Sequence, residues 1–167
     1  MTRPNSIERF PEIAVCLAAF NGTCWITEQL DTILAQTGVA VTVFVSVDAS
    51  VDGTENSVNA YAQADSRIVV LPHSRYFGGA SKNFFRLLVE LDLTEFDYIS
   101  FADQDDIWER DKLIRHVELM QKNNVDGLSS NVIAFWPDGR IKLIDKSQPQ
   151  CELDFLFESA GPGCTYL

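Results

Sequence analysis

The stretch YISFADQDDIW, residues 98–108, joins an apolar run to a cluster of carboxylates. Its first half belongs to FDYISFA (96–102), which has the length and composition of a buried strand. Asp103 follows that run directly, and Asp105 and Asp106 come next. Clustered acids repel one another wherever water is partly excluded. The stretch therefore predicts that a strand ends before Asp103 and that another group offsets the repulsion among these carboxylates.

Outward from this stretch, apolar runs of strand length alternate with segments whose apolar residues recur at helical spacing. Such alternation implies right-handed crossovers and a mainly parallel sheet with helices on both faces, which is an α/β fold. The segments that flank Pro137–Gly139 predict an antiparallel hairpin, which would make the sheet mixed. The expected strands are 13–19, 41–47, 67–72 and 96–102, the expected helices are 23–37, about 54–64, 82–91 and 109–123, and the hairpin arms are 127–136 and 140–144.

Length and composition indicate one folded domain over residues 1–167, with a core from about residue 13. The formal charge of −11 argues against nucleic acid or an anionic membrane as a partner held by general attraction. No apolar run approaches the ~20 residues of a spanning helix, so the expected location is cytoplasmic. The chain ends within an apolar phrase, FLFESAGPGCTYL (155–167), and we expect it to be truncated there. The cysteines are expected to be reduced thiols, mostly in apolar surroundings: Cys16, Cys24, Cys151 and Cys164.

Strand-to-helix loops of a parallel sheet converge at the carboxyl ends of the strands, where ligands bind. Asp48 and Asp103 each follow an apolar run directly, so both side chains are expected to point into one crevice. The stretch DASVDGT (48–54), taken alone, is also consistent with an ordinary turn that begins a helix. In the glycine stretch 75–83, Gly78 and Gly79 would permit close approach of a ligand. Arg75 or Lys82 would offer a cation for phosphate, while His73 and His116 are interpreted as non-catalytic surface residues.

The acidic stretch has two interpretations. Asp106 or a neighbour could cap a helix over 109–122, with Glu109 completing a capping box. That interpretation accounts for one acid only. Asp103 and Asp105, two positions apart, can both turn toward a shared cation, and carboxylates with substrate phosphate oxygens are typical ligands of Mg²⁺ and Mn²⁺. A bound divalent cation would relieve the repulsion.

Four segments in this order resemble the family 2 inverting glycosyltransferases of the GT-A fold, and most closely the bacterial rhamnosyltransferase-like group. They are VCLAAFNGTCWITEQLDTILAQT (15–37), VDASVDGT (47–54), GGASKNFFRLL (78–88) and FADQDDIWERDKL (101–113). The resemblance extends from about residue 13 to the end. It implies a three-layer, Rossmann-like domain, a nucleoside-diphosphate-sugar donor, Mn²⁺ or Mg²⁺, and a glycan or lipid-linked acceptor in polysaccharide assembly. Peripheral membrane association of the full-length protein is a further expectation, as is a homo-oligomer formed through an exposed, truncated sheet.

The resemblance also implies roles for individual residues. The donor's nucleoside would lie against Ala18, Phe20 and Asn21, with Phe20 on the base. Asp48 would hydrogen-bond the base, although Val47 stands where the family usually has a second acid, so the base preference is open. Lys82 and Asn83 would lie near the donor, and Trp108 would close the site by packing. In the D-x-D segment, Asp105 would bind the metal, Asp103 would contact ribose or metal, and Gln104 would lie between them.

The resemblance assigns no catalytic base, because the family's base lies in a part of the domain beyond a segment like GPGCTY (161–166). Asp154 and Glu158 are nearby but outside the family's motif. Donor binding without turnover is therefore one expectation, and a non-catalytic nucleotide-sugar-binding module is the alternative function. A receiver-like signalling domain would need an acid pair after the first strand, where this chain has AAFNG (18–22).

Overall fold

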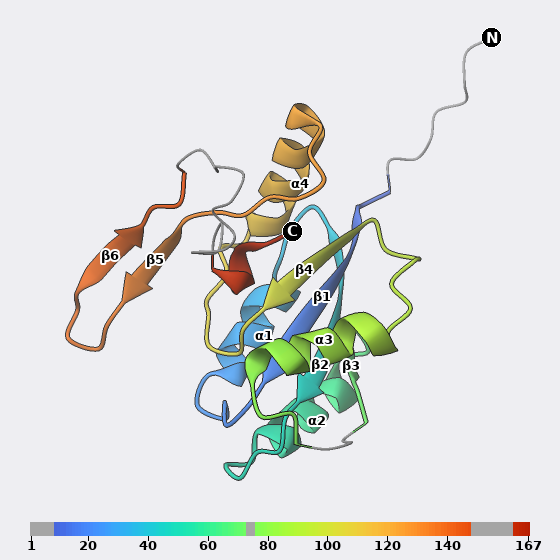
Figure 1. The fold of residues 1–167 in the computed structure, drawn as a ribbon, viewed down its shortest axis with the longest axis vertical. Helices are drawn as coiled ribbons and strands as arrows, with labels where there is room; N and C mark the ends of the chain where they lie inside the picture. The colour runs from blue at the N-terminus through green and yellow to red at the C-terminus, as the bar shows by residue number, and fades with distance from the viewer. Residues whose placement is uncertain (1–8, 73–75, 148–161) are drawn as a thin grey trace.

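A computed structural model describes residues 9–72, 76–147 and 162–167 (Figure 1). Its central sheet has four strands, all paired in parallel, in the spatial order β3-β2-β1-β4. The β-branched and apolar runs of the sequence form these strands because such side chains pack well on a pleated sheet that is buried on both faces. The strands are β1 Glu12–Ala19, β2 Ala40–Val47, β3 Ile68–Val70 and β4 Tyr98–Ala102.

The helices cover both faces of the sheet, which gives three layers (Figure 1). Successive side chains of a strand point to opposite faces. In β1, Val15 and Leu17 join the larger core cluster on one face, while Cys16 joins Leu87 in a smaller cluster on the other. The larger cluster includes side chains of α1 Ile26–Leu34, α2 Thr54–Ala64 and α4 Lys112–Asn123, and the smaller one includes those of α3 Ala80–Glu90. The predicted α/β class and parallel sheet are thus confirmed.

The strand order places a topological switch point at β1, because the chain runs outward through β2 and β3 and then returns to add β4 on the opposite side of β1. Loops that leave neighbouring strands at such a point diverge and leave a crevice beyond the carboxyl ends. Ala19 pairs with Val47, and Leu17 pairs with Ala102, so β1, β2 and β4 all end at the same edge. The segments that begin at Phe20, Asp48 and Asp103 meet there.

The predicted hairpin is confirmed, but it forms a sheet of its own rather than an antiparallel part of the main sheet. β5 Val132–Phe135 pairs antiparallel with β6 Ile141–Ile144. The C-terminal residues lie instead beside β4: the Ser100 hydroxyl donates to the Tyr166 carbonyl at 2.8 Å. Leu167 and Leu128 exchange two backbone hydrogen bonds of 3.0 Å, next to the short 3-10 helix η2 Gly163–Thr165.

Two expectations about side-chain environment need correction. His116, expected at the surface, is buried on the inner face of α4 with Leu113 and Val117, because its position falls on the apolar face of that helix. Of the cysteines, Cys16 and Cys164 are buried as expected, whereas Cys24 is exposed. His73, Arg75 and Cys151 lie outside the described residues. No helix in the described part of the chain is long and apolar enough to cross a bilayer.

Candidate functional site

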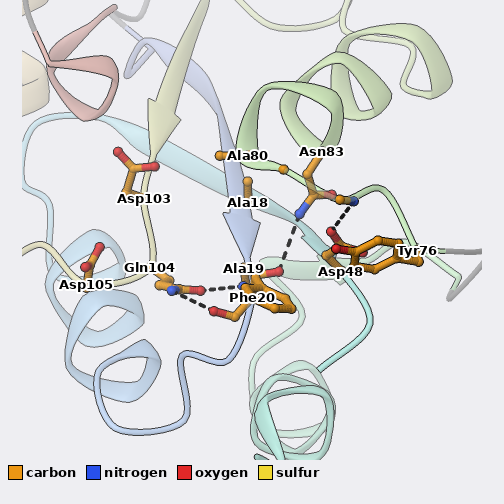
Figure 2. A pocket seen from close by; sticks show the side chains of 12 residues that line it. Ala18, Ala19, Phe20, Asp48, Tyr76, Ala80, Asn83, Asp103, Gln104 and Asp105 are labelled. Carbon is orange, nitrogen blue, oxygen red and sulfur yellow. Dashed lines mark hydrogen bonds between the residues drawn. The ribbon is translucent and has the colours of Figure 1, made fainter. Parts of the chain in front are cut away.

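A cavity of about 340 Å³ opens where the loops meet at the carboxyl ends of the strands (Figure 2). Asp103 and Asp105 lie on the β4 side of this cavity, and Asp48 and Tyr76 lie on the far side, beyond Ala18. The predicted crevice is therefore present and brings together segments far apart in sequence. Its lining residues are Ala18, Ala19, Phe20, Asp48, Tyr76, Gly78, Gly79, Ala80, Asn83, Asp103, Gln104 and Asp105.

The β4 side of the cavity carries the acids. Burial first, and then the neighbouring charges of Asp106 and Asp105, raise the pKa of Asp103 to about 6. The neighbouring carboxylates and the partial burial of this site thus disfavour ionisation of Asp103, as the sequence predicted. Asp103 and Asp105 both line the cavity, and Asp105 is exposed.

Gln104 joins the acidic loop, residues 103–106 after β4, to the β1 loop, which follows β1 and begins at Phe20. The Phe20 backbone N–H donates to Gln104 Oε1 at 2.5 Å, and Gln104 Nε2 donates to the Phe20 carbonyl at 2.9 Å. Gly22 packs beneath this amide, since a Cβ on Gly22 would lie 2.6 Å from Gln104 Oε1. The half-exposed Phe20 ring remains at the cavity wall while its backbone is held (Figure 2).

Asn21 holds the β1 loop to the β2 loop. Its φ of 47° lies in the left-handed region, which Asn tolerates better than most residues. Its Oδ1 accepts from the Val51 N–H and its own N–H donates to Ser50 Oγ, both at 3.0 Å. Asn21 is not among the residues that line the cavity, so its predicted contact with the nucleoside stays a prediction.

The Asp48 carboxylate lies beneath the glycine-containing segment before α3. It accepts hydrogen bonds from the backbone N–H groups of Ala49 and Phe77 at 2.8 Å and of Gly78 at 3.0 Å. Burial alone would raise the pKa of Asp48, but these backbone donors outweigh it and hold the pKa below its ordinary value. Asp52, in the same loop, instead accepts from the Thr54 N–H at the start of α2, as an ordinary helix-start turn does.

A buried polar network that the sequence analysis missed lies behind Asp48. The Ser46 hydroxyl donates to Asn83 Oδ1 at 2.5 Å and accepts from Arg86 at 3.1 Å. Asn83 Nδ2 donates to the Ser46 carbonyl at 2.9 Å, so the amide of Asn83 is occupied by the end of β2. One buried face of α3 carries residues at helical spacing, namely Asn83, Arg86 and Leu87. This spacing is the sequence signal from which the buried network could have been predicted.

Lys82 is not among the residues that line the cavity. It is exposed and lines a neighbouring hollow of about 450 Å³ with Phe85 and Val89 on the outer side of α3. Its predicted place near the donor phosphates therefore stays a prediction. Tyr76, which the sequence analysis did not single out, is the large side chain of this segment that does line the cavity (Figure 2).

The capping interpretation of the acidic stretch is wrong. Helix α4 begins at Lys112 behind Asp111, which makes no side-chain capping hydrogen bond, and Asp106 lies beside Cys164 instead. Ligand atoms of Asp103, Asp106 and Cys164 lie within 4.8 Å of one another. Because burial and the bond to Asp106 raise the pKa of the Cys164 thiol, this sulfur stays protonated, and the carboxylates are the groups suited to a divalent cation.

Trp108 is buried beside this cluster, as predicted for a packing residue. The Lys112 ammonium lies 3.2 Å from the Trp108 ring centroid and donates to the Cys164 carbonyl at 2.7 Å. Burial lowers the pKa of Lys112 to about 7. The backbone of the C-terminal segment is thereby held against the acidic loop.

Comparison with known proteins agrees with this geometry. A model of the family described as "Glycosyl transferase family 2" matches residues 14–149. The dTDP-rhamnosyl transferase RfbG of Shigella flexneri is 47% identical over 152 residues, which are 90% of this chain and 53% of that protein. An Escherichia coli protein named UDP-Glc:alpha-D-GlcNAc-diphosphoundecaprenol beta-1,3-glucosyltransferase WfgD is 28% identical over 71% of this chain and 45% of its own length. The chain thus spans about half the length of these relatives.

Solved structures share the fold. Staphylococcus aureus TarS 1-349 in complex with UDP superposes with a TM-score of 0.62 at 22% identity, covering 72% of this chain and 35% of that one. The mannosyltransferase PcManGT from Pyrobaculum calidifontis, in complex with GDP-Man and Mn²⁺, also has a TM-score of 0.62 at 22% identity, covering 78% and 37%. At this identity the likeness concerns the arrangement of elements alone.

Proposed function

Because the chain belongs to glycosyl transferase family 2, we propose that it binds a nucleoside-diphosphate-sugar donor and serves in transfer of the sugar, with inversion, to a glycan or lipid-linked acceptor in cell-surface polysaccharide synthesis. The Shigella relative is named for a dTDP-rhamnosyl donor, and its identity of 47% favours a dTDP-linked sugar here. The relative named for a diphosphoundecaprenol substrate favours a lipid-linked acceptor, and we propose that the transfer takes place at the inner face of a membrane.

The observation that carries this proposal is the cavity at the switch point. An aromatic face (Phe20), a glycine-bearing segment (Gly78, Gly79) and a carboxylate pair (Asp103, Asp105) line one space. An aromatic ring suits a base, a glycine-bearing segment permits close approach of a ligand to its backbone, and a carboxylate pair suits the cation of a diphosphate. Phe20 and Ala18 lie between the acids and the far side of this space, where Asp48 and Tyr76 lie (Figure 2).

The acidic loop fits a divalent cation. Burial and like charge destabilise ionised Asp103, and a cation would reverse that effect. Asp103 and Asp105 would hold the ion from the cavity wall, and Asp106 lies next to Asp103 and Cys164. When bound, a divalent cation stabilises the negative charge that grows on a departing diphosphate. The amide of Gln104, the residue between the two acids, is hydrogen-bonded to the Phe20 backbone.

The remaining groups bind and orient the donor. Phe20 would lie against the base, and Ala18 and Ala80, both small, leave room for the ligand between β1 and α3. Asn83 fixes the end of β2 rather than facing the ligand with a free amide. Inversion also requires a base near the acceptor hydroxyl. We assign none: Asp154 and Glu158 lie outside the described residues.

Isothermal titration calorimetry tests the proposal. UDP, dTDP and GDP are titrated into the purified chain with Mn²⁺, with Mg²⁺ and with a chelator. We expect at least one nucleoside diphosphate to bind, and to bind on the order of tenfold or more tightly with the cation, because the acids repel an uncompensated diphosphate. Absence of binding to all three with either ion would overturn the proposal. Metal-independent binding would overturn the role of the acidic loop.

A further inference from the structure

We propose that Arg86 is a positioning residue for the donor site: from behind the cavity wall it holds Phe77 and the end of β2, and thereby fixes the segment 76–79, here called the glycine loop, where a donor can bind. Arg86 is not among the residues that line the cavity, whereas Tyr76, Gly78 and Gly79 are. The inference rests on the proposed donor site for its ligand, but the contacts that carry it are present in the free chain.

The first observation is that one buried guanidinium bonds three separate parts of the chain. Arg86 Nη1 donates to Ser46 Oγ at 3.1 Å, and Nη2 donates to the Pro72 carbonyl at 2.5 Å. Its Nε donates to Glu90 Oε2 at 2.9 Å. The Arg86 side chain is 3% exposed, and a buried cation is tolerated only where such partners replace its lost hydration. Arg86 therefore connects α3 with β2 and with the chain that follows β3.

The second observation is the contact of the same group with the glycine loop. The Arg86 guanidinium carbon lies 5.3 Å from the centroid of the buried Phe77 ring, within the range of a cation–π contact. The backbone turns directly after this ring, because Gly78 has a φ of 75°, in the left-handed region. Phe77 stands between Tyr76 and Gly78 in the chain, so the position of its ring sets where these two neighbours meet the cavity.

The third observation is that the same network reaches Asn83, which lines the cavity. Ser46 Oγ donates to Asn83 Oδ1 at 2.5 Å and accepts from Arg86. Asn83 and Arg86 are three positions apart on α3, so both lie on its buried face. Two parts of the cavity wall, the glycine loop and the first turn of α3, thus depend on one side chain outside the cavity lining.

Loss of this group would weaken donor binding without removing a contact to the donor. If the glycine loop can adopt several positions, the apparent dissociation constant rises in proportion as the fraction of molecules with the binding position falls. Lysine is not an adequate replacement. Its ammonium keeps the charge but has neither a planar face nor a fixed fork of donors, so it cannot serve Ser46, Pro72 and the Phe77 ring together.

The test compares Arg86→Lys and Phe77→Leu, which removes the ring and leaves the hydrogen bonds of Arg86, with the control Val117→Ala. Val117 is buried in the larger core cluster, on the opposite face of the sheet from α3, so its variant reports a general loss of stability. Dissociation constants for UDP, dTDP and GDP are measured with Mn²⁺ under conditions in which circular dichroism shows each protein to be folded.

We expect Arg86→Lys and Phe77→Leu each to weaken every nucleotide that the wild type binds on the order of tenfold, and Val117→Ala to keep the wild-type affinity. Wild-type affinity in Arg86→Lys or in Phe77→Leu would overturn the proposal, as would an equal loss in Val117→Ala. If Arg86→Lys does not fold, Phe77→Leu decides by the same criterion.

A measurement without ligand separates this proposal from the proposed function. The Gly78 N–H donates to Asp48 at 3.0 Å, so its hydrogen exchange, followed by NMR, reports how often the glycine loop opens. We expect its protection to fall on the order of tenfold in Arg86→Lys and Phe77→Leu but not in Val117→Ala. An unprotected Gly78 amide in the wild type would overturn the proposal even if neither variant folds. If the wild type binds no nucleotide, the proposed function fails, whereas this exchange still decides whether Arg86 positions the loop.

Discussion

Gln104 and Phe20 hold each other by a reciprocal pair of hydrogen bonds, in which both amide atoms of the side chain bond the backbone of one residue. The pair connects the end of β1 with the end of β4 across the switch point. It therefore sets the distance between the aromatic wall of the cavity and its acidic wall.

Replacing Gln104 with Ala should weaken nucleotide binding while lowering the stability of the fold only slightly. The lost bonds lie in a partly exposed loop, so we expect a loss of about 1 kcal/mol in the free energy of unfolding. Affinity for a nucleoside diphosphate with Mn²⁺ should fall roughly fivefold to tenfold, because the two walls are no longer held together. Gln121→Ala is the control, since its side chain bonds Tyr98 at the start of β4. Equal affinities of the two variants would contradict this prediction.

Replacing Asp105 with Asn should abolish most of the gain in nucleotide affinity that a divalent cation provides. The amide keeps the shape but lacks the charge that attracts the ion. Asp111→Asn, an exposed acid near the start of α4, serves as the matched control. Calorimetry with and without Mn²⁺ measures the effect. An unchanged dependence on Mn²⁺ in Asp105→Asn would argue that Asp103 and Asp106 hold the ion without it.

Arg86→Met should destabilise the chain strongly, by about 3 kcal/mol in the free energy of unfolding. Its side chain is 3% exposed, and its loss leaves the Pro72 carbonyl and Ser46 without their donor. Glu90, the other end of its ion pair, is 49% exposed, so Glu90→Gln should cost under about 1 kcal/mol. Urea denaturation of both variants checks the contrast. Similar midpoints would mean that the buried network contributes little.

Stability should decrease as the pH falls from about 6.5 toward about 4, in part through His116. Burial, with the nearby charges of Lys112 and Arg115, lowers the pKa of His116 from 6.5 to about 4. In that window the unfolded chain binds a proton at this position and the folded chain does not. This difference lowers the free energy of unfolding by at most about 3 kcal/mol.

Comparison with His116→Gln isolates this effect, because Asp103, whose pKa is raised, contributes in the opposite direction. The wild type should lose more stability than the variant between pH 7 and pH 4.5, measured by urea denaturation. Parallel curves for the two proteins would contradict a buried neutral imidazole.

The sequence alone determined the fold class and the location of the site. Strand-length apolar runs with periodic helices between them allow few architectures, and Asp48 and Asp103 follow their strands so closely that one edge of the sheet must carry both. The family resemblance, now confirmed, rested on these same segments. Such features are local, since each depends on the order of residues within one element.

Only the tertiary structure decided what each polar side chain touches. Asp106 looked like a helix cap but lies beside Cys164, 58 positions later. His116 looked solvated but faces the interior. Asp48 meets the backbone of Phe77 across 29 positions. These partners are brought together by the packing of distant elements, and a carboxylate or guanidinium bonds whichever donor or acceptor the fold places beside it, so no local pattern encodes the choice.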